Sequence, residues 1–112
     1  MIIFHNARCQ KSREALEILN RHGEDVTIRE YLKEPPTQKE LADLLKKLGM
    51  KPEELLRKTE PLFKEKYKDK NYSSKQWIKI MCENPILIQR PIVISGDKAI
   101  LGRPPIKVID IL

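Results

Sequence analysis

The stretch HNARCQKSR, residues 5–13, decides the fold because a strand pattern ends and a helix pattern begins within it. The residues before it, MIIF at 1–4, form an apolar run of the kind that a buried strand has. After it, small and apolar residues recur at the spacing of one helix face: Ser12, Ala15, Leu16 and Leu19. The sequence therefore predicts a strand, a short loop that carries Cys9, and a helix.

Cys9 is placed where its thiol can ionise. Unpaired backbone N–H groups and the positive end of the helix dipole favour an anion at a helix start. Arg8, Lys11 and Arg13 add positive charge around it, and thiols in such settings have pKa values of roughly 3.5–7.5 instead of about 8.5. A free cysteine is more commonly a small buried residue. Three basic neighbours at a strand-to-helix junction nevertheless favour a reactive thiolate.

Length and composition indicate one domain spanning residues 1–112. With 40% hydrophobic and 34% charged residues, the chain is globular. Its apolar runs fall far short of the ~20 residues of a membrane span, and the apolar start is too short for a signal peptide. Two cysteines at unrelated spacing form neither a disulfide framework nor a zinc site. We expect a cytoplasmic monomer, with no membrane contact and no bound metal.

The net charge of +6 arises from 22 basic and 16 acidic residues. Such a balance is compatible with nucleic acid, an acidic membrane or a small anionic substrate. Many of the lysines lie between Lys58 and Lys75, where acidic residues are interleaved with them, as is typical of a solvated helix face. Only 5% of the residues are aromatic, and no stripe of basic and stacking residues favours a nucleic-acid partner.

The order of elements predicts an α/β fold. The alternating, β-branched segment 26–31 reads as a second strand, which makes a βαβ unit with the first strand and helix. Segments 92–95 and 98–101 read as a hairpin joined by Gly96-Asp97. A short final helix should then turn three apolar residues toward the core: Ile106, Ile109 and Leu112. Together these elements outline a thioredoxin-like, mixed four-stranded sheet.

Residues 37–84 read as a helical insertion into that sheet. Thr37 and Glu40 form a capping box ahead of an apolar leucine stripe that Gly49 ends. Pro52 opens a short helix, and Ser73 caps another that stops before Pro85.

Three arginines lie at the ends of elements instead of on a charged face. Arg57 follows a leucine pair, whereas Arg90 and Arg103 each precede a proline, which holds the backbone extended. The guanidinium fork matches an oxyanion and keeps its charge, although an isolated arginine is more commonly a surface residue. Because ligands gather at the carboxyl ends of parallel strands, we expect Cys9, Arg90 and Arg103 to meet at one edge, where Arg57 could close over them.

Four blocks of the sequence resemble the glutaredoxin-coupled arsenate reductase family, in order and over essentially the whole chain. They are residues 5–13, 55–58, 84–92 and 102–105. The chain departs from the family pattern at Ala7, where proline is common, and it stops after the final helix, where longer members continue.

The resemblance implies a thioredoxin-like fold with a helical insertion and a single catalytic cysteine, Cys9. It implies no bound cofactor: glutathione acts as co-substrate and glutaredoxin as partner in reducing arsenate or a similar oxyanion. It assigns three arginines to substrate binding: Arg57, Arg90 and Arg103. Arg8, which precedes Cys9, is our further candidate for substrate binding. The resemblance matches His5 and Ser12 to residues that support the thiolate, and Pro91 to the cis-proline of thioredoxin-like sites.

Several alternatives stay open at this point. His5 either favours the thiolate or fills the strand end, and Ser12 either bonds the thiolate or lies on the helix surface. Cys82, in a predicted helix, reads as a core residue more readily than as a resolving thiol.

Other functions also fit the fold. A redox-responsive regulator that binds RNA polymerase commonly uses Cys-x-x-Cys, but Ser12 stands at the second position here. A monothiol glutaredoxin-like exchanger would tolerate Ser12 but leave the arginines without a purpose. A phosphatase loop, Cys-x5-Arg, is excluded by Ala15.

Overall fold

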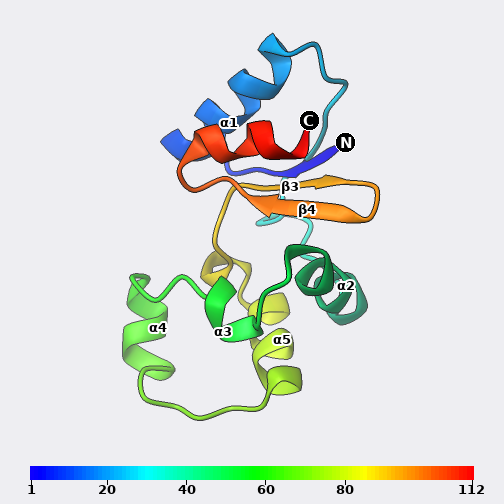
Figure 1. Ribbon diagram of the computed structural model, residues 1–112. Coiled ribbons are helices and arrows are strands. Elements are labelled where there is room, and N and C mark those ends of the chain that lie inside the picture. Colours follow the sequence, from blue (N-terminus) through cyan, green and yellow to red (C-terminus); the bar gives the residue numbers. More distant parts are fainter. The chain divides into compact units, whose positions relative to one another are not determined.

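A computed structural model describes all residues from 1 to 112. The chain divides into two compact units, the first formed by residues 1–34 with 90–112 and the second by residues 35–89. The first unit holds the sheet, and the second is helical (Figure 1). No helix combines the length and the apolar character that crossing a membrane requires.

The first unit contains the predicted mixed sheet of four strands, in the order β2-β1-β3-β4. These strands are β1 (Ile2–Phe4), β2 (Thr27–Arg29), β3 (Ile92–Ser95) and β4 (Lys98–Leu101). β1 runs parallel to β2 and antiparallel to β3, and β3 is antiparallel to β4. The α/β fold predicted from the sequence is thus confirmed, and the hairpin strands have the predicted bounds.

The second strand is shorter than the predicted segment 26–31, because the chain turns after Arg29. The backbone N–H groups of Lys33 and Glu34 both donate to the carbonyl of Glu30, which closes this turn. The turn buries Tyr31 completely and stacks its ring on Phe4, with centroids 6.1 Å apart. Ring packing therefore replaces strand pairing at this end of β2.

The core of the first unit lies between the sheet and two helices. α1 (Gln10–Arg21) and the 3₁₀ helix η2 (Pro105–Ile111) lie on the same face of the sheet (Figure 1). Five fully buried residues form its centre: Ile3, Ala15, Leu19, Val93 and Val108.

The predicted final helix is present as a 3₁₀ helix, but the prediction of its inward face is wrong. Val108 is its buried residue, whereas the three predicted inward residues are exposed: Ile106 at 56%, Ile109 at 38% and Leu112 at 46%. Three residues per turn place Val108 and Ile111 on one face. Close packing at Gly102 selects that face, since a β-carbon there would lie 3.0 Å from Val108 Cγ1.

Gly102 gives a stability prediction. A β-carbon at this position would also lie 2.9 Å from Pro91 Cγ, so Gly102→Ala overpacks the contact between the site edge and η2. We expect it to lower the free energy of unfolding by about 1–3 kcal/mol in urea titrations. The matched control is Gly96→Asn, since Gly96 has open space and a φ of +60° that asparagine tolerates. Equal stability of the two variants would contradict this packing.

The second unit is built from capped helices. α2 (Gln38–Leu48) begins with the predicted capping box, in which Thr37 Oγ1 accepts from the Glu40 N–H at 3.1 Å, and it ends at Gly49, whose φ is +66°. Ser73 caps α5 in the same way. The other helices are short: α3 (Pro52–Leu55), α4 (Pro61–Lys66) and the 3₁₀ helix η1 (Pro85–Leu87), with α5 spanning Ser74–Glu83.

Candidate functional site

The register of the sheet brings three loops to one edge. Phe4, the last residue of β1, pairs with Ile92, the first of β3, and Ile92 pairs with Leu101, the last of β4. The loop that begins at His5 therefore leaves the sheet at the same edge as the segments at 90–91 and 102–104. The Arg90–Pro91 and Arg103–Pro104 peptide bonds are both cis, and cis is the isomer that the resemblance implies for Pro91.

Cys9 is the half-buried N-cap residue of α1, and its backbone N–H donates to the carbonyl of Asn6 at 2.9 Å. Burial acts to raise the pKa of the thiol, but hydrogen bonds and charge outweigh it, so the pKa is lowered. The opposing groups are the Ser12 N–H, the Arg90 guanidinium through a hydrogen bond and its charge, and the Lys11 N–H. The arrangement favours a thiolate, which is the nucleophilic form of cysteine.

The side chain that stabilises the thiolate differs from the expectation based on neighbouring charges. Arg90, distant in sequence, supplies it, whereas Lys11 acts through its backbone N–H. The guanidinium of Arg13 instead donates to the carbonyl of Ala7 at 2.9 Å and braces the loop.

Ser12 and His5 form a buried pair beneath the Cys9 loop. Ser12 Oγ accepts from the backbone N–H of Asn6 at 3.1 Å and lies 2.7 Å from His5 Nδ1. The Ser12 hydroxyl already accepts one hydrogen bond, from the Asn6 N–H. It can therefore donate a hydrogen bond to Nδ1 of a neutral His5 imidazole whose own proton is on Nε2. Burial lowers the pKa of His5; Glu30 opposes this, and Arg13 reinforces it. Ser12 thus reaches the thiol through its backbone while its side chain holds the loop.

Asn6 is the residue of this loop that sequence reasoning missed. Its backbone carbonyl accepts a hydrogen bond from the Cys9 N–H, and its side-chain Oδ1 accepts one from the Arg8 N–H at 3.0 Å. An asparagine that leads into a tight loop is a recognisable signal of such a turn. Arg8 itself is exposed, and its side chain borders a cavity of about 310 Å³ with His5, Asn6 and Ala7.

Arg90 is buried at the site edge, with 8% of its surface exposed. Its Nε has no hydrogen-bond partner and no access to solvent. Arg103, half-buried, donates from its guanidinium to the Arg90 carbonyl at 3.0 Å. A buried charged donor without a partner costs free energy, so the unpartnered Nε of Arg90 is a feature that the function of this edge has to explain.

Arg57 and Cys82 belong to the second unit. The Arg57 guanidinium lies 3.3 Å from a carboxylate oxygen of Glu60, and both side chains are partly buried. The Arg57 N–H donates to the Leu87 carbonyl at 2.7 Å, which fixes its backbone. Burial raises the pKa of the Cys82 thiol to about 11, and the charges of two nearby glutamates add to the effect. Cys82 is therefore a neutral thiol near pH 7.

Comparison with known proteins identifies the family. A model of the ArsC family matches residues 4–111, which is nearly the whole chain. The chain belongs to the ArsC family. The thioredoxin-like fold and the family predicted from the sequence blocks are confirmed.

Individual relatives agree with this assignment over nearly their full length. The chain is 40% identical to an arsenate reductase of Haemophilus influenzae, with 100% of this chain and 98% of the relative aligned. It is 44% identical to the protein YfgD of Escherichia coli K12, which is described as uncharacterized, over 98% of this chain and 94% of that one. The solved structure of an arsenate reductase from Vibrio cholerae superposes with a TM-score of 0.94 at 38% identity, covering 99% and 96% of the two chains.

Proposed function

We propose that this ArsC-family protein reduces arsenate to arsenite, with the Cys9 thiolate as nucleophile. The observation that carries the proposal is the contact between the half-buried Cys9 thiol and Arg90, whose buried Nε lacks a partner. A guanidinium with unused donors can hold an oxyanion bidentately and offset charge on its leaving oxygen. Its relatives named arsenate reductase support arsenate as that oxyanion.

In the proposed first step, the Cys9 sulfur attacks arsenic and one arsenate oxygen, after protonation, leaves as water. This forms a covalent thiol–arsenate adduct that still contains arsenic(V). Glutathione then attacks, and glutaredoxin completes the transfer of two electrons. Over the whole cycle two thiols are oxidised to one disulfide, arsenic gains two electrons and arsenite departs. Phosphate has the same shape but resists reduction by thiols, so the chemistry selects arsenate even where binding does not.

The remaining residues have proposed roles in the same cycle. Arg90 and Arg103 hold the oxyanion at the sheet edge. Arg57, which the family resemblance assigns to substrate binding, and Arg8 are proposed as further oxyanion contacts. Ser12 and His5 hold the loop in the conformation that points backbone N–H groups at the Cys9 sulfur. The hydrogen bond between their side chains supports this role. Pro91, at the cis-proline position, is proposed to position the backbone of Arg90 at the site.

A coupled assay tests the proposal. The purified protein is incubated with arsenate, glutathione and glutaredoxin, and arsenite release is measured against a panel that includes phosphate, selenate and sulfate. We expect arsenite release that requires both thiol donors and a Michaelis constant for arsenate that rises when phosphate is added. Turnover with no member of the panel would contradict an enzymatic role and leave the regulatory alternative.

A further inference from the structure

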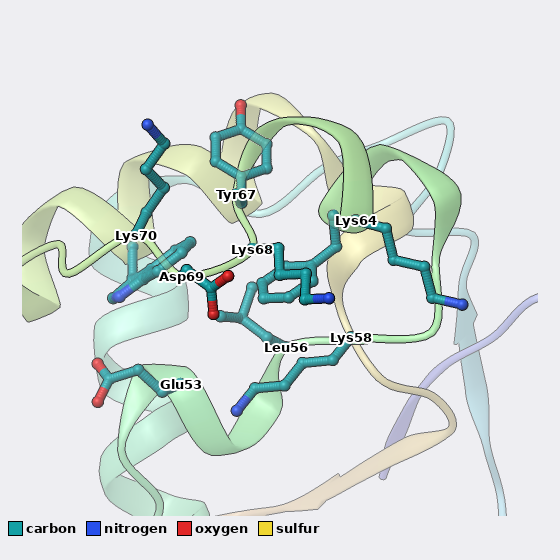
Figure 2. A pocket seen from close by; sticks show the side chains of 10 residues that line it. Glu53, Leu56, Lys58, Lys64, Tyr67, Lys68, Asp69 and Lys70 are labelled. Atoms are coloured by element: carbon teal, nitrogen blue, oxygen red, sulfur yellow. The ribbon is translucent and has the colours of Figure 1, made fainter.

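The inserted unit contains a cavity that the proposed reaction does not use. It has a volume of about 530 Å³, within the range of roughly 300–1,000 Å³ that is usual for small-molecule sites. All of its lining residues lie between positions 53 and 77: Glu53, Leu56, Lys58, Phe63, Lys64, Tyr67, Lys68, Asp69, Lys70 and Trp77 (Figure 2). We call it the lysine-rimmed cavity.

An aromatic cluster supports the wall of the lysine-rimmed cavity. Phe63 stacks on Trp77 with centroids 6.3 Å apart, and Tyr67 meets Trp77 edge-on at 6.1 Å. Tyr72 packs against the same indole from 5.0 Å. Phe63 and Trp77 are buried, as is Leu56, so the apolar wall is fixed by packing instead of by loop conformation. A preformed wall lowers the entropic cost of binding an apolar group.

The rim of the cavity is charged, with four lysines against two carboxylates. None of these lysines forms an ion pair with a carboxylate. In Figure 2 the ammonium groups of Lys58 and Lys68 reach toward the middle of the cavity, whereas Lys64 and Lys70 extend outward. The carboxylate of Asp69 also points into the cavity. The cavity therefore offers unpaired positive charge beside an apolar wall.

We propose that the lysine-rimmed cavity binds an amphipathic organic anion, with an apolar or aromatic body against Leu56 and the aromatic wall and an acidic group between Lys58 and Lys68. The unpaired ammonium groups select a negative charge, and the concave shape favours a compact molecule. A flat protein interface would need about 800 Å² from each partner, which a cavity of this size does not offer. Binding here is independent of the Cys9 chemistry.

The single tryptophan of the chain, Trp77, makes the proposal directly measurable. The probe is anilinonaphthalenesulfonate, an aromatic sulfonate that accepts excitation energy from a nearby indole. We expect saturable binding of one dye per protein, seen as loss of Trp77 emission with gain of dye emission, and weakened by added salt. The uncharged analogue phenylnaphthylamine, which lacks the sulfonate, should bind at least about fivefold more weakly.

Charge variants locate the bound sulfonate. Lys58→Gln with Lys68→Gln should weaken dye binding by about five- to tenfold, the effect of two partly screened charges. The control, Lys39→Gln with Lys75→Gln, removes the same charge from exposed positions outside the cavity and should leave the affinity within about twofold. Asp69→Asn should tighten binding about two- to threefold, because it removes a repelling carboxylate. Asparagine tolerates the φ of +63° found at Asp69, so this variant keeps the backbone.

Two results would overturn the proposal: equal dye affinity of the lysine double variant and its control, or dye binding that leaves Trp77 emission unchanged. The Cys9→Ser variant should bind the dye as the natural protein does. Failure of arsenate reduction and failure of this binding site are therefore separate outcomes.

Discussion

We expect Cys9→Ser to lower arsenite formation in the coupled assay by at least about a thousandfold, the scale seen when a nucleophile is removed. Serine keeps the size of the side chain and its place at the N-cap of α1, but its hydroxyl does not ionise near pH 7. The variant should therefore fold and bind the oxyanion while leaving arsenic unreduced. Circular dichroism and urea titration check that the fold is retained.

Cys82→Ser is the matched control for this prediction. Burial raises the pKa of the Cys82 thiol to about 11, so it is protonated at the assay pH and is a poor nucleophile. We expect its activity to stay within about twofold of the natural protein, as for a residue that is outside the chemistry. Activity that survives in Cys9→Ser, or that disappears in Cys82→Ser, would indicate that Cys82 and not Cys9 is the nucleophile.

Arg90→Ala should lower kcat/KM for arsenate by about 100- to 1,000-fold, because it removes a charged donor beside the reacting sulfur. The same substitution should raise the pKa of the Cys9 thiol, since the Arg90 hydrogen bond and charge both lower it. A single variant thus affects both substrate binding and the nucleophile. Steady-state kinetics and a thiol titration measure the two effects separately.

Two further variants keep the Arg90 prediction interpretable if alanine disturbs the buried edge. Arg90→Lys retains the charge but loses the guanidinium fork, so it should recover the thiol pKa more fully than it recovers the Michaelis constant for arsenate. Arg21→Ala removes an exposed arginine that pairs with Glu17 on α1, and its kinetics should be unchanged. Equal kinetic effects of Arg90→Ala and Arg21→Ala would contradict an oxyanion site at Arg90.

The strands and the capped helices could be predicted because local chemistry specifies them. Gly96 permits the left-handed turn between β3 and β4, and Thr37 with Glu40 fixes the start of α2 through two hydrogen bonds. The meeting of His5, Pro91 and Gly102 at one edge also follows from strand order alone, as the register confirms. The turn and the cap depend on residues that are close in sequence, and one hairpin joins Pro91 to Gly102; only the approach of His5 depends on the order of the strands.

The errors arise where distant residues decide the outcome. Val108 is buried because it packs on Gly102 in a 3₁₀ turn. The apolar spacing of an α-helix does not predict this contact. The guanidinium that lowers the Cys9 pKa comes from Arg90, eighty-one positions along the chain, instead of from the adjacent basic residues. The lysines between Lys58 and Lys75 are exposed, as interpreted from the sequence. The sequence does not indicate that four of them also border a cavity, which exists because Phe63 and Tyr67 pack against Trp77 from another helix.

The ionisation of Cys9 is the most direct test of its role as a thiolate held by Arg90 and backbone N–H groups. Ultraviolet absorbance of the thiolate is followed against pH in the Cys82→Ser background, where Cys9 is the only cysteine. We predict a midpoint below the ordinary cysteine value of about 8.5, with the thiolate and arsenate reduction both lost as pH falls through that midpoint. A midpoint at or above 8.5, or one unchanged by Arg90→Ala, would contradict that role.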